Sequence, residues 1–264
     1  LLPVLGQRSS TGTGVGQMAA IIPPGAPLNV GSFATIEGAL RPAGTLGTRL
    51  TESRRKKLLD LVNSLSGSQA RAVASAGTAT GAALAKVVEF ATGKNVEISG
   101  KADPGIDPGL NTDMATIWGI NAQNKNGANY VPAAMTFNVL KGNAPLAGID
   151  MGGFDYHGAT RDQQNAADQR AGEMVGRILA SAKAMNRPMM IHVVTDGSVS
   201  SGGTDFASAF TNDSGTQGMS FIFAFNPFQR PKQKDDRFKH QIGHYTPGQG
   251  AATASVVGNT KKAA

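Results

Sequence analysis

The chain has 264 residues, 40% hydrophobic and 16% charged, so it can bury one large core or two small ones. It contains no uninterrupted apolar run of about eighteen residues, which excludes a membrane span at the level of sequence. The net charge is +7, but residues 54–57 lack aromatic neighbours and residues 230–239 are interrupted by Asp235 and Asp236, so nucleic acid is not an expected partner.

Residues 1–50 are rich in glycine and proline, and we expect an irregular N-terminal segment there. The glycine run at residues 9–16 lacks the Gly-Lys-Ser/Thr ending of a phosphate loop and is interpreted as a flexible loop. A helix is predicted for residues 51–65, with Thr51 or Ser53 as its cap. Its apolar side chains form a single stripe: Leu58, Leu59, Leu61, Val62 and Leu65.

A second helical segment, rich in alanine, is predicted for residues 69–90, followed by a loop at 93–110 that contains two Asp-Pro-Gly turns. A short helix is expected around residues 112–120, where Trp118 is interpreted as an anchor in the core or in a groove. Pro132 suits the first turn of the next helix, at 132–140.

The strongest pattern is a strand, helix and strand between residues 146 and 194. Residues 146–149 read as a short buried strand, residues 161–185 carry apolar side chains at helical spacing, and residues 189–194 read as a second buried strand. Such a unit predicts parallel strands joined by a right-handed crossover. Asp155, His157 and Asp196, which follow the two strands, are therefore expected to converge at one crevice.

The C-terminal part is expected to contain two strands separated by a charged loop. A strand is predicted at residues 221–225, an exposed charged loop at 229–239, and a last short strand at 256–259. The predicted organisation is an irregular segment at 1–50, an α/β domain at 51–258 and a tail at 259–264.

Carboxylate and imidazole groups at strand ends are the usual ligands of a divalent cation that polarises an ester. Asp155 and His157 could form one side of such a site, Asp196 a third ligand, and His240 or His244 a late ligand from the C-terminal loop. The alternative is a structural pair in which Asp155 and His157 only tie down their loop. His192, within the second strand, is interpreted as a core histidine.

The segment Ile-Asp-Met-Gly-Gly-Phe-Asp-Tyr-His-Gly at residues 149–158 resembles the G-[WF]-D-T-H motif of the DUF1501 family. These are exported bacterial proteins related to the sulfatases in the alkaline phosphatase superfamily. Residues 132–148 and 189–194 resemble the family's flanking helix and strands, and residues 202–205 resemble its later G-G-T-D-H segment. The resemblance covers residues 51–258 and is specific only around the first motif.

The resemblance implies a doubly wound, mostly parallel α/β fold, truncated at its N-terminus, with a two-metal site for phosphate or sulfate esters. Asp155 and His157 match one ligand set, Asp196 belongs to the second, and His244 is the candidate late ligand. The metal would be zinc, calcium or magnesium, and the substrate a small anionic ester. The catalytic nucleophile is not assigned.

Two departures from the family pattern leave the activity open. Phe206 stands where the motif has a metal-binding histidine, and Gly197 offers no side chain beside Asp196. The chain is therefore expected to be either an exported metal-dependent hydrolase domain, with degeneration of its site, or a structural subunit of an extracellular homo-oligomer or filament. Absence of cysteine fits export, and a start at Leu1 indicates a removed leader or a piece of a longer polypeptide that pairs with a missing portion or a second chain.

Overall fold

The computed structural model divides the chain into two compact units, Leu1–Asp150 and Met151–Ala264, which are considered separately. The residues that the structure describes are 5–6, 28–40, 49–74, 86, 89, 93, 96–97, 105–195, 198–201, 210–214 and 220–232. None of the helices in these ranges has the length and apolar composition that crossing a bilayer requires.

Among its described residues, the first unit contains a small parallel sheet and several helical segments. The strands are β1 (Leu5–Gly6), β2 (Leu28–Asn29) and β3 (Ala147–Gly148), in the order β2-β1-β3. Leu5 lies opposite Leu28 on one side and Ala147 on the other. The helical segments are α2 (Phe33–Leu40), α4 (Glu52–Ala74), the 3-10 turn η1 (Pro108–Leu110), α6 (Thr112–Trp118) and α7 (Tyr130–Leu140).

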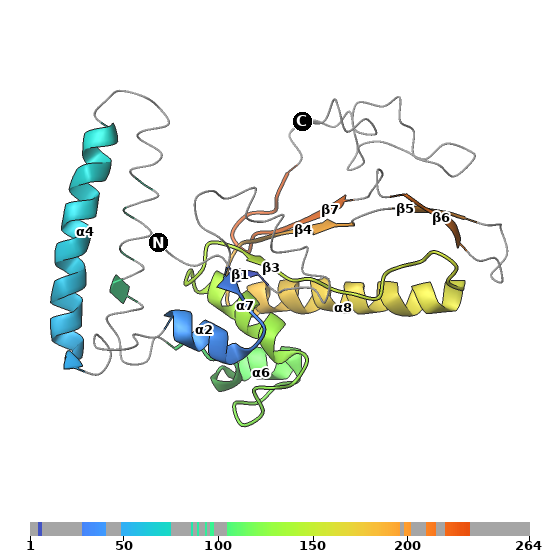
Figure 1. Ribbon diagram of the computed structural model, residues 1–264, viewed down its shortest axis with the longest axis horizontal. Helices are drawn as coiled ribbons and strands as arrows, with labels where there is room; N and C mark the ends of the chain where they lie inside the picture. The colour runs from blue at the N-terminus through green and yellow to red at the C-terminus, as the bar shows by residue number, and fades with distance from the viewer. Residues whose placement is uncertain are drawn as a thin grey trace. The chain divides into compact units, whose positions relative to one another are not determined.

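The core of this unit forms where α2 packs beside α7 (Figure 1). Phe33, Ile36 and Leu40 recur at helical spacing on α2, and all three are buried. The ring of Phe33 meets that of Tyr130 edge to face, with centroids 5.3 Å apart. The expectation of an irregular segment at 1–50 is therefore wrong for α2, because a short apolar face was sufficient to fold it onto α7.

Three predicted helices of the first unit are confirmed with shifted bounds, whereas the predicted break between 65 and 69 is wrong, because α4 runs without interruption from Glu52 to Ala74. The helix predicted at 132–140 is α7, the short helix at 112–120 is α6, and Trp118 is fully buried as expected. The helix predicted at 51–65 is α4, and the N–H of Arg54 donates to Thr51 Oγ1 at 3.4 Å, so Thr51 caps it. Its apolar stripe is not buried, because Leu61 is 70% exposed and Leu65 is 66% exposed. Most of the second helical segment, 69–90, lies outside the described residues.

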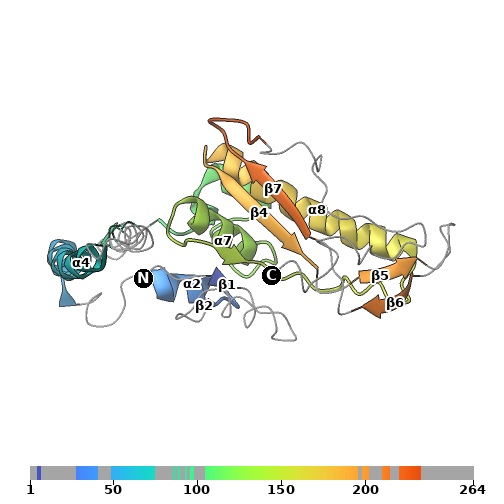
Figure 2. The same cartoon turned by 90° about the horizontal axis from the view of Figure 1, so that it is seen from above.

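The second unit contains α8 (Arg161–Ala184) and two antiparallel pairs. β4 (Met189–Val194) pairs with β7 (Ser220–Phe225) over six residues, as the two opposed arrows in Figure 2 show. β5 (Ser198–Ser201) pairs with β6 (Phe210–Ser214) through a register shift at Val199 and Ser200. The predicted strands at 189–194 and 221–225 and the helix at 161–185 are confirmed.

β4 pairs with β7 in antiparallel register, and the predicted parallel pairing of β3 with β4, which lie in different units, stays a prediction. One expectation about this unit is corrected. β4 is not a buried strand, since burial alternates along it and Met190 is 71% exposed. Its continuous apolar run resembled that of a covered strand, but in the structure only one face is partly covered.

Candidate functional site

The candidate site is the loop between β3 and α8, residues 149–160, which carries Asp155 and His157. Both side chains are exposed. A carboxylate oxygen of Asp155, Oδ1, accepts a hydrogen bond of 3.1 Å from the backbone N–H of His157. This contact is an Asx turn, which restricts the backbone between the two residues and keeps both of them in one tight turn.

The loop is attached to the first turns of α8 by two side chains. Nη2 of Arg170 donates to the carbonyl of Gly153 at 3.1 Å, and its guanidinium lies 5.2 Å from the ring centroid of Phe154. The hydroxyl of Tyr156 donates to Asp168. Partial burial, followed by the hydrogen bond with Asp168, raises the pKa of Tyr156, so this hydroxyl remains a donor at neutral pH. The loop is thus held at both sides of Asp155.

The start of α8 completes this frame. The Thr160 hydroxyl accepts from the N–H of Gln163, and the Gln163 side chain accepts from the N–H of Thr160 at 2.9 Å, which is a capping box. Gly153 and Gly158 have φ angles of 81° and 74°, in the left-handed region that favours glycine. Gly153 and Gly158 of the Gly-Gly-Phe-Asp-Tyr-His-Gly segment therefore have a local structural reason.

Only two of the four predicted metal ligands lie within the residues that the structure describes. Asp155 and His157 are neighbours through their turn, whereas Asp196 and His244 lie outside the described residues, as do Gly197 and Phe206. Within the described part of the chain, no group of three or more His, Asp or Glu residues could hold a metal ion. The four-ligand set and the identity of a divalent metal therefore remain predictions.

His192 was expected to lie in the core, and this is wrong. It is exposed on β4, opposite Ile222 of β7. Side chains alternate between the two faces of a strand, and Met190, His192 and Val194 share the exposed face. The apolar residues next to His192 in the sequence therefore do not make His192 buried.

Sequence reasoning missed a polar cluster in the first unit, in which buried Asp107 and Tyr130 meet the half-buried Glu37 and Lys125. Asp107 is 5% exposed and its carboxylate accepts from Lys125 Nζ at 2.8 Å, from the Tyr130 hydroxyl and from the N–H of Gly109 at 2.9 Å. Lys125 also lies 3.6 Å from Glu37 and 4.6 Å from the centroid of the Phe33 ring. The only sequence signal for this cluster was the Asp-Pro-Gly turn at residues 107–109. A turn signal does not indicate that Asp107 contacts residues far away along the chain.

Mutual hydrogen bonding sets the charge states in this cluster. Burial raises the pKa of Asp107, but the hydrogen bonds from Lys125, Tyr130 and Gly109 outweigh it and hold the pKa below its usual value. The hydrogen bond to Asp107 raises the pKa of Lys125, and burial with the same bond raises that of Tyr130. Because these groups already make hydrogen bonds to one another, the cluster suits a structural role better than a catalytic one.

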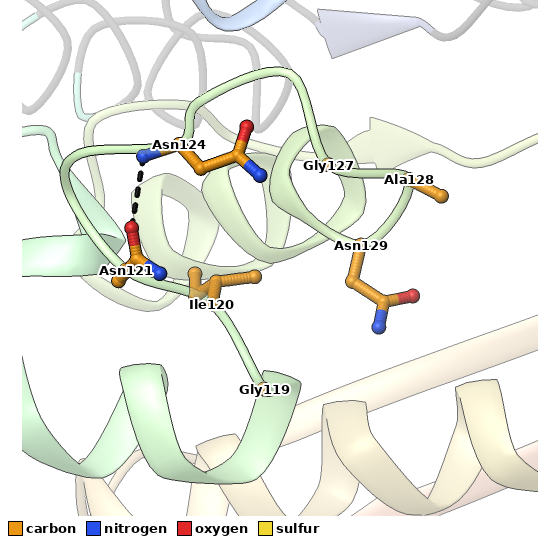
Figure 3. Close-up of a pocket in the computed structure, with 7 residues that line it drawn as sticks. All are labelled: Gly119, Ile120, Asn121, Asn124, Gly127, Ala128 and Asn129. Carbon is orange, nitrogen blue, oxygen red and sulfur yellow. Dashed lines mark hydrogen bonds between the residues drawn. The ribbon is translucent and has the colours of Figure 1, made fainter.

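A small hollow lies in the same unit, between the end of α6 and the start of α7 (Figure 3). Its volume is about 130 Å³, enough for a few water molecules. Oδ1 of Asn121 accepts from the N–H of Asn124 at 2.8 Å across its rim, as the dashed line in Figure 3 marks. The walls carry amide groups and no titratable side chain: Gly119, Ile120, Asn121, Asn124, Gly127, Ala128 and Asn129.

Comparison with known proteins finds no matching family model, no matching curated protein and no matching solved structure.

Proposed function

We propose that the chain is an exported, metal-dependent hydrolase-like domain for phosphate or sulfate esters, built on a doubly wound α/β fold. The observation that supports it is the frame around Asp155 and His157, which holds both side chains on an exposed curl next to the N-terminus of α8. A loop fixed by a capping box, an arginine and a tyrosine costs little entropy to organise when a ligand binds.

The donor chemistry of the loop fits a divalent cation. Asp155 uses one carboxylate oxygen on the N–H of His157, and within the described residues its second oxygen makes no hydrogen bond. A carboxylate with an imidazole suits zinc, whereas further carboxylate oxygens would favour calcium or magnesium. In this proposal Asp155 and His157 hold one side of the cation, with Asp196 and His244 as the remaining ligands. A bound cation would supply polarisation of the ester oxygen.

Metal binding to the purified chain tests this proposal. We expect titration calorimetry with Zn²⁺, Mn²⁺ and Mg²⁺, together with elemental analysis, to show one tightly bound cation. Asp155→Asn and His157→Ala should each weaken binding by more than the roughly 10-fold effect of losing an outer-shell partner. Asp162→Asn, an exposed acid in the first turn of α8, is the matched control and should leave binding unchanged.

Turnover is tested with aryl phosphate and aryl sulfate esters on the metal-loaded chain. Metal-dependent hydrolysis that is lost in Asp155→Asn supports the hydrolase. A chain that neither binds metal nor turns over either ester, alone or as part of a longer precursor, would exclude the proposal. Metal binding without turnover would identify a degenerate relative that keeps the cation only.

A second function, a structural subunit of an extracellular homo-oligomer, is favoured by three exposed apolar side chains on one face of β4 and β7, a face that also carries His192 and Ser220. Met190, Val194 and Ile222 are 71%, 65% and 66% exposed, and the register places them on one face of the ribbon. A two-stranded ribbon is marginally stable by itself. Exposed apolar patches on ribbons with open edges are typical of association sites. The occupant in this proposal is a second copy of the chain, which presents the same face.

A further inference from the structure

The loop between α6 and α7 contains the only Asn-Gly pair in the sequence, Asn126-Gly127. Asn126 is exposed and Gly127 forms part of the wall of the amide-lined hollow (Figure 3). The neighbouring residue, Lys125, is the cation that bridges Glu37 and Asp107. A change of charge at residue 126 would therefore occur next to the main polar tie of this unit.

We propose that Asn126 is a site of spontaneous covalent modification by deamidation. The backbone nitrogen of Gly127 gives up its proton and attacks the side-chain carbonyl carbon of Asn126. A new C–N bond forms, the bond from that carbon to Nδ2 breaks, and Nδ2 takes up the proton and leaves as ammonia. The product is a five-membered succinimide. Water then opens one of its two carbonyls, which gives aspartate or, when the main-chain carbonyl is cleaved, isoaspartate. The reaction requires only water and needs neither enzyme nor oxidant.

The local structure leaves both reacting groups free. Within the described part of the chain, the Asn126 side chain and the Gly127 N–H make no hydrogen bond. Gly127 has no Cβ to obstruct the attack, and the space beside it is open, since an added Cβ would meet only the Asn124 carbonyl oxygen at 3.9 Å. The Gly127 carbonyl is held by the N–H of Tyr130 at 2.9 Å, so the loop stays attached to α7.

Three other asparagines of this region, Asn121, Asn129 and Asn138, make hydrogen bonds through their side chains. The amide oxygen of Asn121 accepts from two backbone N–H groups, and Asn129 Nδ2 donates to the Trp118 carbonyl at 3.1 Å. Asn138 donates to two carbonyls and is fully buried. None of these three residues precedes a glycine. Asn126 therefore combines exposure, a free amide and a glycine neighbour.

Both products would perturb the cluster. A carboxylate at residue 126 offers Lys125 another anionic partner, in competition with Asp107 and Glu37. Isoaspartate also adds one methylene to the main chain between Asn124 and Asn129, which line the hollow. We expect the modified chain to unfold at a lower temperature than the unmodified chain and the hollow to change shape.

The test is peptide mapping after incubation of the folded chain at mildly alkaline pH, with digestion at acidic pH to stop the reaction. The peptide that contains Asn126 should gain about 1 Da and separate into two products, aspartate and isoaspartate. Gly127→Ala is the matched variant, because its Cβ fits at ordinary contact distance, and it should slow the conversion about tenfold or more. Asn126→Gln should show no conversion over the same period.

Three results would overturn the proposal. They are no mass gain at Asn126, equal conversion in Gly127→Ala and the unaltered chain, or conversion at Asn121 or Asn129 as fast as at Asn126. Circular dichroism of Gly127→Ala confirms that a slower reaction does not come from a changed fold. Asn126→Asp, made directly, checks the consequence and should melt below the unaltered chain.

Discussion

Gly109 shows how one residue controls the first unit. A Cβ added there would lie 2.6 Å from the Tyr130 hydroxyl oxygen and 2.7 Å from the backbone nitrogen of Ala122. The hydroxyl belongs to the Asp107 cluster, and the nitrogen belongs to the loop that leads to α7. The glycine of this Asp-Pro-Gly turn is therefore required by close approach, in addition to the turn itself.

We predict that Gly109→Ala lowers the free energy of unfolding by about 1–3 kcal/mol, because the new methyl group must displace main chain. Gly127→Ala, in the neighbouring loop, has open space and should change stability little. Urea unfolding of both variants measures the difference. Equal stability of the two variants would show that Ala122 and Tyr130 do not approach Gly109 as closely as the structure places them.

Asp107 predicts a dependence of stability on pH. Its folded-state pKa lies below the ordinary value of 3.8, so its contribution is fully present above that value and is lost as the pH falls through the lower folded pKa. At neutral pH, Asp107→Asn should lower the free energy of unfolding by about 1–3 kcal/mol, because buried donors lose their anionic acceptor. As the pH falls below 3.8, towards the lower folded pKa, the difference from the unaltered chain should shrink.

Urea unfolding across this range measures that loss, with Asp113→Asn as the control. Asp113 is an exposed acid in the first turn of α6 and lies in the same unit. A difference between Asp107→Asn and the unaltered chain that stays constant down to strong acid would contradict the depressed pKa.

At the scale of elements, α8 is determined by local signals. The Thr160 and Gln163 capping box starts it, and Lys183 stands in its last turn, where a cation interacts favourably with the helix dipole. Two exposed glycines, Gly172 and Gly176, weaken its middle, and a Cβ at either would meet nothing within 4 Å. The two glycines therefore lower the stability of α8, and within the described residues no close contact requires them.

We predict that Gly172→Ala raises the free energy of unfolding by about 0.5–1 kcal/mol, because alanine loses less backbone entropy in a helix. Gly153→Ala should do the opposite. Its φ of 81° disfavours a side chain, and its Cβ would lie 3.2 Å from Arg170 Nη2. Thermal melts and hydrogen exchange along α8 distinguish the two, and a destabilised Gly172→Ala would indicate an unseen contact on that face.

Strand pairing shows the limit of local signals at this scale. The apolar run at residues 189–194 predicted a strand correctly, and α8 was predicted from its apolar periodicity. The same patterns did not predict that β4 pairs with β7 in antiparallel register. Periodicity specifies which residues form a strand, but main-chain hydrogen bonds do not depend on side-chain identity, so the partner is not encoded locally.

For the whole molecule, the exposed side chains of Met190, Val194 and Ile222 on β4 and β7 predict association in solution. We expect light scattering to show concentration-dependent oligomers, and Met190→Lys combined with Ile222→Lys to shift them to monomer, because two charges cannot be buried against an apolar partner surface. Leu110→Lys, at a residue 69% exposed in the first unit, is the control and should leave the oligomer intact. A monomer at all concentrations would exclude the structural-subunit function.

The sequence by itself determined the short-range features of this protein: α6, α7, α8 and the strand positions of β4 and β7. Each depends on side chains within a few positions of one another. The tertiary structure decided that Asp107 joins Lys125 and Tyr130, that His192 is exposed, and that β4 pairs with β7. Those outcomes depend on which distant segments contact one another. Many segments could bury the same apolar surface or make the same hydrogen bonds, and only the complete fold selects among them.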